Sequence, residues 1–234
     1  MTDRPINLTD WQVRAALDGR LSLVVEPLAK QPPESMAMYR YYGHEAPRPD
    51  LCHSFGWMVP EAGDLWPCNV EDRIPIRRAT GDRLWVREAW RPSISAADPW
   101  HVAVLYPNDS KVRHWDWSSD DDFGDWIIPK AAAKGNISSQ HMPRWASRLT
   151  LIVTDVRVMR VQEIGEDQAA ATGLFKPYDI PLRELVDSPF RTSFQRAWNT
   201  RHSKRGLGWD ANPWVTATAV TVHRCNIDQM EVAE

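Results

Sequence analysis

The sequence has few of the features that would assign its class at once. Its 234 residues include three cysteines (Cys52, Cys68 and Cys225), whose spacing fits neither a disulfide framework nor a paired zinc motif. No apolar run approaches the roughly 18 residues that cross a bilayer, and the start, MTDRPINLTDW, lacks the basic and apolar regions of a secretory signal. We therefore expect a cytoplasmic protein with no membrane partner.

The sequence also lacks an excess of positive charge: its 28 Lys and Arg are balanced by 31 Asp and Glu. The formal net charge is −3, which argues against a scaffold that coats nucleic acid by charge alone. A role with nucleic acid would have to rest on a local basic patch or a pocket.

Tryptophan is the residue type that stands out. It occurs 13 times and outnumbers the five tyrosines and five phenylalanines together. Its large ring suits both a packed core and the stacking of another ring, so both interpretations stay open. The hydrophobic fraction of 43% and charged fraction of 25% are those of an ordinary soluble globular protein.

Several helices and strands are well signalled. Thr9 and Gln12 form a capping-box pattern before a helix over 10–18, and Gly19 stands where that helix would end. Further helices are expected over 163–172 and from Ser188, where Phe190, Phe194 and Trp198 share one face. Strands are expected over 21–26, 74–78, 81–90, 101–106, 149–161 and 214–224.

Two of these strands carry further information. In the strand over 81–90, Leu84, Val86 and Glu88 share one face, so Glu88 would be a buried carboxylate in need of a partner. In the strand over 149–161 the apolar positions change parity near Thr154 and Asp155, which predicts a β-bulge or bend.

About six strands and three helices in mixed order, without a βαβ repeat, predict an α+β fold built on a small mixed β-barrel. We expect one domain over 1–234, with irregular insertions around 30–72 and 91–140. The Trp-rich acidic segment 115–126 is expected to be an exposed loop rather than a metal site, because its carboxylates lack a defined ligand spacing.

Five motifs in order resemble the ASCH domain family. They are the helix–Gly19–Arg20–strand start, GDRLWVREAW (81–90), HMPRWASRLTLIVTDVRV (141–158), EIGEDQAAATG (163–173) and WDANPWV (209–215). The likeness is greatest to the larger members carried by phages and prophages. It implies a PUA-like β-barrel whose cleft receives RNA or a modified base.

Small members of that family are amidohydrolases that remove the acyl group of N-acetylcytidine with a Lys, a Thr and a Glu. The matching positions here are Leu21, Val24 and Ile152. Apolar side chains cannot transfer protons or attack a carbonyl, so this chemistry is expected to be absent. Ser22 and Glu26 are the nearest polar groups, but they do not match the motif.

The polar and aromatic residues left near the expected cleft favour recognition of nucleic acid or a modified nucleobase, because Arg forks suit phosphates and Trp faces suit unpaired bases. The candidate ligand-binding residues are Arg20, Glu26, Trp85, Arg87, Arg144, Trp145, Arg148, Trp209 and Asp210. The alternative is structural, with Trp145 filling the barrel and the arginines pairing with Glu88 or Asp155.

Other functions remain open. One is an enzyme acting on nucleosides or RNA, either an N-acylcytidine amidohydrolase or a ribonuclease, with Glu88 and His141 as its candidate catalytic groups. Another is a protein partner bound through the Trp-rich segment 114–126. The scattered Cys52, His53 and Cys68 have no zinc-site spacing, so no metal or other cofactor is expected.

Overall fold

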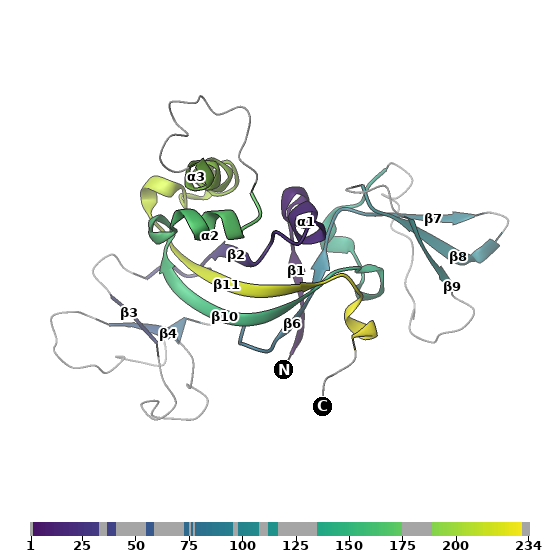
Figure 1. Cartoon of the computed structure of the whole chain (residues 1–234), viewed down its shortest axis with the longest axis horizontal. Helices are drawn as coiled ribbons and strands as arrows, with labels where there is room; N and C mark the ends of the chain where they lie inside the picture. The colour runs from purple at the N-terminus through teal and green to yellow at the C-terminus, as the bar shows by residue number, and fades with distance from the viewer. Residues whose placement is uncertain are drawn as a thin grey trace. The chain divides into compact units, whose positions relative to one another are not determined.

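The computed structural model describes residues 2–32, 37–40, 55–58, 73–74, 76, 78–95, 98–107, 112–116, 135–174 and 189–230. Its strands are β1 (Asp3–Asn7), β2 (Leu23–Pro27), β3 (Ala37–Arg40), β4 (Phe55–Met58), β5 (Arg73–Ile74), β6 (Arg83–Arg87), β7 (Arg91–Ser95), β8 (Asp98–Leu105), β9 (Val112–Asp116), β10 (Thr150–Arg160) and β11 (Trp214–His223). The α-helices are α1 (Asp10–Leu17), α2 (Glu166–Ala171) and α3 (Pro189–His202) (Figure 1). Within these residues no helix is both long and apolar enough to cross a bilayer.

Three sheets organise the described strands. The largest has the order β1-β6-β10-β11-β2, with β1 parallel to β6 and the other described pairs antiparallel. The smaller sheets have the orders β3-β4-β5 and β7-β8-β9. The mixed α and β content agrees with the predicted class. Among the described strands β1 and β2 are the two edges of an open five-stranded sheet, so the predicted closed barrel is not seen there.

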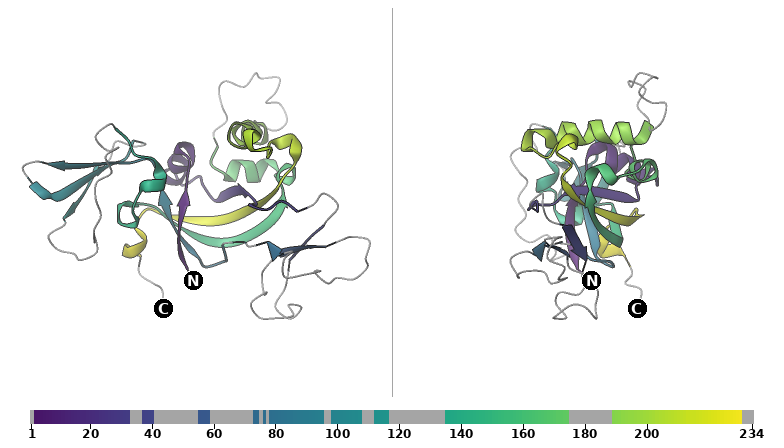
Figure 2. Two further views of the ribbon diagram at one scale, coloured as in Figure 1. Left: turned by 180° about the vertical axis from the view of Figure 1, so that it is seen from behind. Right: turned by 90° about the vertical axis from the view of Figure 1, so that its left-hand side faces the viewer.

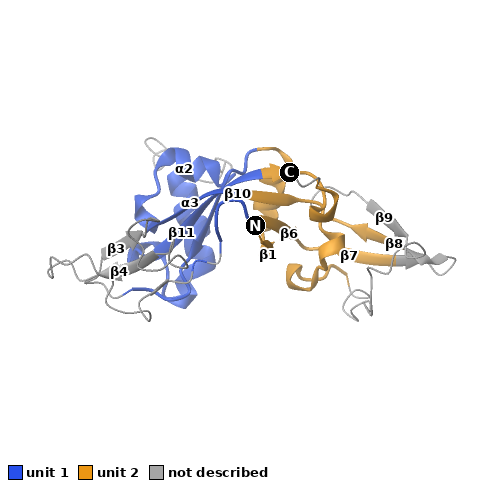
Figure 3. Ribbon diagram, turned by 90° about the horizontal axis from the view of Figure 1, so that it is seen from below, with its two compact units in different colours: residues 1, 20–82, 153–221 blue, residues 2–19, 83–152, 222–234 orange. Residues whose placement is uncertain are grey.

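The chain divides into two compact units that are not consecutive in sequence (Figure 3). Unit 1 comprises residue 1, 20–82 and 153–221, and unit 2 comprises 2–19, 83–152 and 222–234. The two long strands β10 and β11 each contribute residues to both units.

Unit 2 contains α1, β1, β6 and the β7-β8-β9 sheet. The side chain of Gln12 accepts a hydrogen bond from the Thr9 backbone N–H at 3.0 Å, as the capping pattern predicts, and Gly19 follows the helix with a φ of +73°. A hydrophobic core of this unit packs residues 102–106 against Trp90 and against residues of the segment 137–146. The buried residues are Trp90, Val102, Val104, Tyr106, Ile137, Met142 and Ala146.

Unit 1 contains β2, most of β10 and β11, α2 and α3. Both helices lie on the same side of β10 and β11 (Figures 1 and 2). The carboxylate of Glu166 in α2 accepts hydrogen bonds from the backbone N–H groups of Phe190 and Arg191 at 2.7 and 2.9 Å. These are free donors in the first turn of α3, so Glu166 caps that helix and ties it to α2.

The face predicted for α3 is correct, because Phe194 and Trp198 are buried and Phe190 packs beside them in a core with Val161, Ile164 and Trp209. The change of parity along β10 is also seen in burial: Leu151 and Val153 are buried on one parity, and Val156 on the other. Ser188, the predicted cap of α3, lies outside the described residues.

The two predicted insertions are less irregular than expected where they are described. β3 and β4 pair within 30–72, and β7, β8 and β9 form a three-stranded antiparallel sheet within 91–140. In the Trp-rich segment, Trp115 and Asp116 end strand β9 rather than begin a loop, and residues 117–126 lie outside the described residues. The strand predicted over 101–106 corresponds to β8, whereas its partners β7 and β9 were not predicted, because tertiary pairing decides such strands.

Candidate functional site

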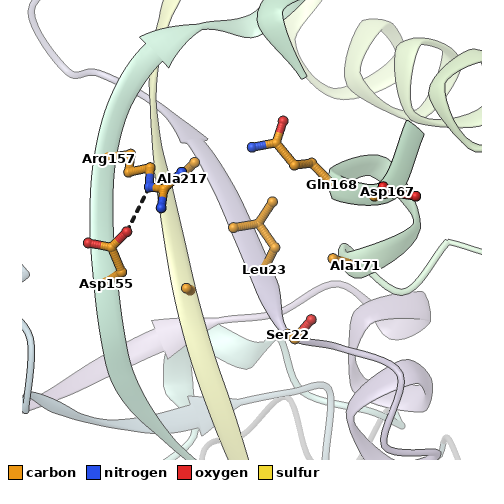
Figure 4. Close-up of a pocket in the computed structure, with 9 residues that line it drawn as sticks. Ser22, Leu23, Asp155, Arg157, Asp167, Gln168, Ala171 and Ala217 are labelled. Atoms are coloured by element: carbon orange, nitrogen blue, oxygen red, sulfur yellow. Dashed lines mark hydrogen bonds and ion pairs between the residues drawn. The ribbon is translucent and has the colours of Figure 1, made fainter. Parts of the chain in front are cut away.

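A pocket in unit 1 lies between β2, β10, β11 and α2 (Figure 4). Its volume is about 300 Å³, which is at the lower end of small-molecule sites. It is lined by Ser22, Leu23, Asp155, Arg157, Asp167, Gln168, Ala171, Ala217 and Ala219. The sequence prediction did not identify this site.

Small side chains on facing elements create the space. Ala217 and Ala219 share one face of β11, and Ala171 projects from α2 on the same side as Asp167, four residues earlier. Pairing of Thr218 with Val24 and of Ala219 with Leu23 fixes the register of β2 beside this face. Larger residues at the alanine positions would fill the volume.

Polar groups surround this apolar surface. The Ser22 N–H donates to the Ala171 carbonyl, and the Ser22 carbonyl accepts from the Val220 N–H, both at 2.9 Å. These bonds use only its backbone, and the residue is exposed where it lines the pocket. Gln168 uses its side-chain oxygen to accept from the Gly165 N–H at 3.1 Å, so its NH₂ group is its remaining donor. Asp167 is exposed in the first turn of α2.

An ion pair completes the rim. Arg157 Nε donates to Asp155 at 2.7 Å, and Figure 4 shows this pair along β10. The side chains are 69% and 34% exposed, respectively, so water screens the pair and either partner can turn to a ligand at small cost. The pocket therefore offers hydroxyl, amide, carboxylate and guanidinium groups.

The positions matching the amidohydrolase trio do not contribute ionisable groups. Leu21 and Val24 are buried, at 3% and 2% exposure, and Ile152 is partly buried in β10. Two carboxylates, Asp155 and Asp167, lie around the pocket instead.

Four of the predicted ligand-binding residues fall in unit 1, outside the pocket lining. Arg20 donates to the Gly173 carbonyl at 2.6 Å, and Glu26 accepts from Arg78 at 2.5 Å. Trp209 is buried in the core with the Arg191 guanidinium 4.9 Å from its ring centre. Asp210 is exposed.

The other candidates fall in unit 2, where Glu88 and Arg148 form a buried bidentate ion pair. Arg148 Nε and Nη2 donate to the two carboxylate oxygens of Glu88 at 2.7 and 2.8 Å. The side chains are 1% and 4% exposed, and the Arg148 guanidinium also lies 4.0 Å from the ring centre of Tyr106. The predicted partner of Glu88 is therefore present, in agreement with the structural alternative for Arg148.

Two further candidates in this unit also make internal contacts. Arg144 binds Asp228 and Asp3, the latter at 2.7 Å, and these two carboxylates raise the pKa of the Arg144 guanidinium. Trp145 packs edge-on against Trp90, with ring centres 6.2 Å apart. Both contacts favour structural roles for the HMPRWASR segment.

His141, the second catalytic candidate, ends a 3₁₀ turn (Ser139–His141) and is exposed. Trp85 and Arg87 share one face of β6, and the guanidinium lies 4.6 Å from the centre of the indole ring. None of these residues lines the pocket of unit 1. In the described part of the chain, no group of three His, Cys, Asp or Glu side chains is placed to hold a metal ion.

Two sequence signals could have indicated the pocket. The run TATA in β11 places two alanines on one strand face, which is unusual for a core position that could hold a valine. In EDQAAA the polar pair Asp167 and Gln168 shares a helix face with Ala171. Neither signal says that the two elements face each other.

The comparisons with known proteins add no relative. Neither a scan against protein-family models nor searches of curated proteins and solved structures find a match to this chain. The resemblance to the ASCH family therefore stays a prediction.

Proposed function

We propose that this protein binds a nucleobase, carried by a modified nucleoside or by nucleic acid, in the pocket between β2, β10, β11 and α2. The observation that carries the proposal is the combination of a small apolar surface (Leu23, Ala171, Ala217 and Ala219) with hydrogen-bonding groups on its rim. A flat heterocycle has this pattern itself, with apolar faces and a polar edge.

The chemistry of the rim favours a ligand that both donates and accepts hydrogen bonds. Asp167 is acceptor-only when ionised, whereas the NH₂ group of Gln168 and the guanidinium of Arg157 are donors. An amino group next to a ring nitrogen or carbonyl, as in cytosine or adenine, complements that mixture. A uniformly anionic ligand would be repelled by the two carboxylates.

The finer fold assignment belongs to the same proposal. The PUA-like barrel and membership of the ASCH family are supported by the order of the five sequence motifs and by the helix α1, Gly19 and β2 succession. A cytoplasmic location is proposed with them.

Binding is tested by calorimetric titration with cytidine, adenosine, uridine, N-acetylcytidine and short single-stranded oligonucleotides. We expect saturable binding of at least one amino-bearing base. Ala219→Leu, which fills the pocket, should abolish binding. Thr221→Leu is the matched control, because it adds a leucine on the same face of β11 at an exposed position outside the pocket lining.

A second pair of variants tests the polar rim. Asp167→Asn should weaken binding of an amino-bearing base roughly tenfold, the effect of losing one hydrogen bond to a charged group. Asp10→Asn is the control, since Asp10 occupies the first turn of α1 in the other unit. Binding that is unaffected by both Ala219→Leu and Asp167→Asn would refute the proposal.

An enzyme acting on such a base is the second candidate. The observation in its favour is that Ser22, Asp155 and Asp167 line the same pocket, so a hydroxyl and two carboxylates meet any bound ligand. Mass spectrometry of N-acetylcytidine and a labelled RNA after incubation would detect deacylation or cleavage. Turnover that is lost in Asp167→Asn but kept in Glu88→Gln would favour catalysis in the pocket.

A further inference from the structure

We propose that Arg87, lying on the ring of Trp85, binds the anionic oxygens of a phosphate group at a site in unit 2. Arg87 ends strand β6, and its guanidinium carbon lies 4.6 Å from the centre of the Trp85 ring. The indole is 7% exposed, so it forms a fixed support for one face of the guanidinium.

Arg87 differs from the other partly or fully buried arginines of the described chain. Each of those donates to a carboxylate or a backbone carbonyl. The pairs with carboxylates are Arg78–Glu26, Arg83–Asp3, Arg144–Asp228 and Arg148–Glu88, and the acceptors of Arg20, Arg160 and Arg191 are backbone carbonyls. The Nε atom of Arg87 is buried and has no hydrogen-bond partner among the described residues.

Arg87 is partly buried, and partial burial of a guanidinium without a counter-charge disfavours its charged form. Burial lowers the pKa of Arg87, and no carboxylate among the described residues opposes this effect. Such a cation gains from an external anion, which would supply the missing charge and would accept from the Nη N–H groups, the donors of Arg87 that are not among its buried atoms.

A second polar side chain lies beside Arg87 on the neighbouring strand β1. Asn7 is the register partner of Arg87 in the parallel β1–β6 pairing, so the two side chains leave the sheet on one face, and Asn7 is exposed. Its amide is a second donor beside the guanidinium. Another ion pair on this face, Arg83 with Asp3, is already closed by two hydrogen bonds of 2.7 Å.

The site itself does not depend on the pocket of unit 1. The choice of phosphate over carboxylate rests on the proposed function, since nucleotides and nucleic acids carry phosphate, which an arginine binds with charge-assisted hydrogen bonds. Free phosphate and a phosphodiester are two sources of the same chemistry, and the experiment separates them.

The test follows the Nε–H signal of Arg87 in NMR spectra of the uniformly ¹⁵N-labelled full chain, assigned from its loss in Arg87→Lys. Inorganic phosphate, a single-stranded hexanucleotide and sodium acetate are titrated separately at constant ionic strength. We expect a saturating shift with the hexanucleotide, with phosphate or with both, and none with acetate. A shift with phosphate alone identifies free phosphate or a monoester as the ligand, and a shift with the hexanucleotide alone identifies a phosphodiester.

The Nε–H of Arg83 is the internal control, because this side chain leaves the same face of β6 and is already paired with Asp3. No shift at Arg87 with either phosphate probe would overturn the proposal. An equal shift at Arg83, or one that acetate reproduces, would also overturn it.

Affinity for the oligonucleotide gives an independent measurement. Arg87→Gln should weaken binding roughly tenfold or more and reduce the salt dependence by about one phosphate contact, while Arg87→Lys retains part of the affinity. Arg4→Gln removes the same charge from an exposed position on β1 and should have little effect. If Arg4→Gln weakens binding as much as Arg87→Gln, the site is not specific. Failure of nucleoside binding to respond to Ala219→Leu would refute the pocket but leave the phosphate shift at Arg87 intact.

Discussion

Replacing Glu88 with glutamine separates a structural role for this carboxylate from a chemical one. In the folded protein its two oxygens accept from Nε and Nη2 of Arg148, and both side chains are almost fully buried, at 1% and 4% exposure. Glutamine has the same shape but places an NH₂ donor against one of the Arg148 donors. The change leaves a charged guanidinium buried without a counter-charge.

The expected loss of unfolding free energy is about 3–5 kcal/mol, the usual effect of removing one partner from a buried ion pair. This would be a large share of the roughly 5–15 kcal/mol that stabilises a typical domain. The matched control is Asp155→Asn. Its ion pair with Arg157 has the same 2.7 Å distance but is 34% and 69% exposed, so we expect a loss below about 1 kcal/mol.

Denaturation in urea, followed by tryptophan fluorescence and by far-UV circular dichroism, measures both losses. The double replacement Glu88→Met with Arg148→Met should recover most of the stability, since well-packed apolar residues often replace a buried pair without loss. If Glu88→Gln and Asp155→Asn destabilise the protein equally, burial does not govern the strength of these pairs and the reasoning fails.

Two further predictions concern pH and salt. Burial, with Arg201 and Arg205 adding to it, lowers the pKa of His202 from 6.5 to about 4, so stability should be full above pH 6.5 and should fall by up to about 3 kcal/mol as the pH drops to 4. Because the ring packs at a tilt against Trp198, with the ring centres 4.2 Å apart, His202→Phe should retain stability at pH 7 and flatten this slope in pH-dependent thermal scans; an unchanged slope would contradict the assignment. Hydrogen bonding to Arg83, with Arg144 contributing, lowers the pKa of Asp3. The ionised Asp3 therefore stabilises the fold above about pH 4, and this stabilisation is lost as the pH falls further. Asp3→Asn should cost about 1 kcal/mol at pH 7 and less at 1 M salt; a loss that does not depend on salt in urea denaturation would argue against an electrostatic origin.

The elements that the sequence predicted correctly are those with local signals. Helix α1 begins and ends within one residue of the prediction. Its start follows the capping pattern of Thr9 and Gln12, and Gly19 with its positive φ comes after its end. The alternation in β6 indicated a buried Glu88 in need of a partner, and the partner is Arg148, one of the arginines named for that role. Each of these signals lies within a few residues of the feature that it predicts.

Features that join distant segments were missed. β1 had no strand signal, and its parallel pairing with β6 links residues 80 positions apart. Arg144 meets Asp3 and Asp228 across 141 and 84 residues, and the pocket brings together four elements. Local propensity cannot indicate which segments face each other, because tertiary pairing decides this.

The interleaving of Arg and Trp is the pattern whose meaning changes most. From the sequence it suggested a groove for stacking bases. In the structure Arg160 covers Trp214 at 4.5 Å and Arg191 covers Trp209 at 4.9 Å, and both guanidinium groups also donate to backbone carbonyls. These contacts lie within one chain and need no ligand. Arg87 lies over the Trp85 ring at a similar distance, 4.6 Å, but its buried Nε has no acceptor among the described residues. A stacked arginine that already donates to an internal acceptor gains little from an external anion, so the lack of any acceptor among the described residues, rather than the Arg–Trp pairing itself, is what makes Arg87 the proposed binding group.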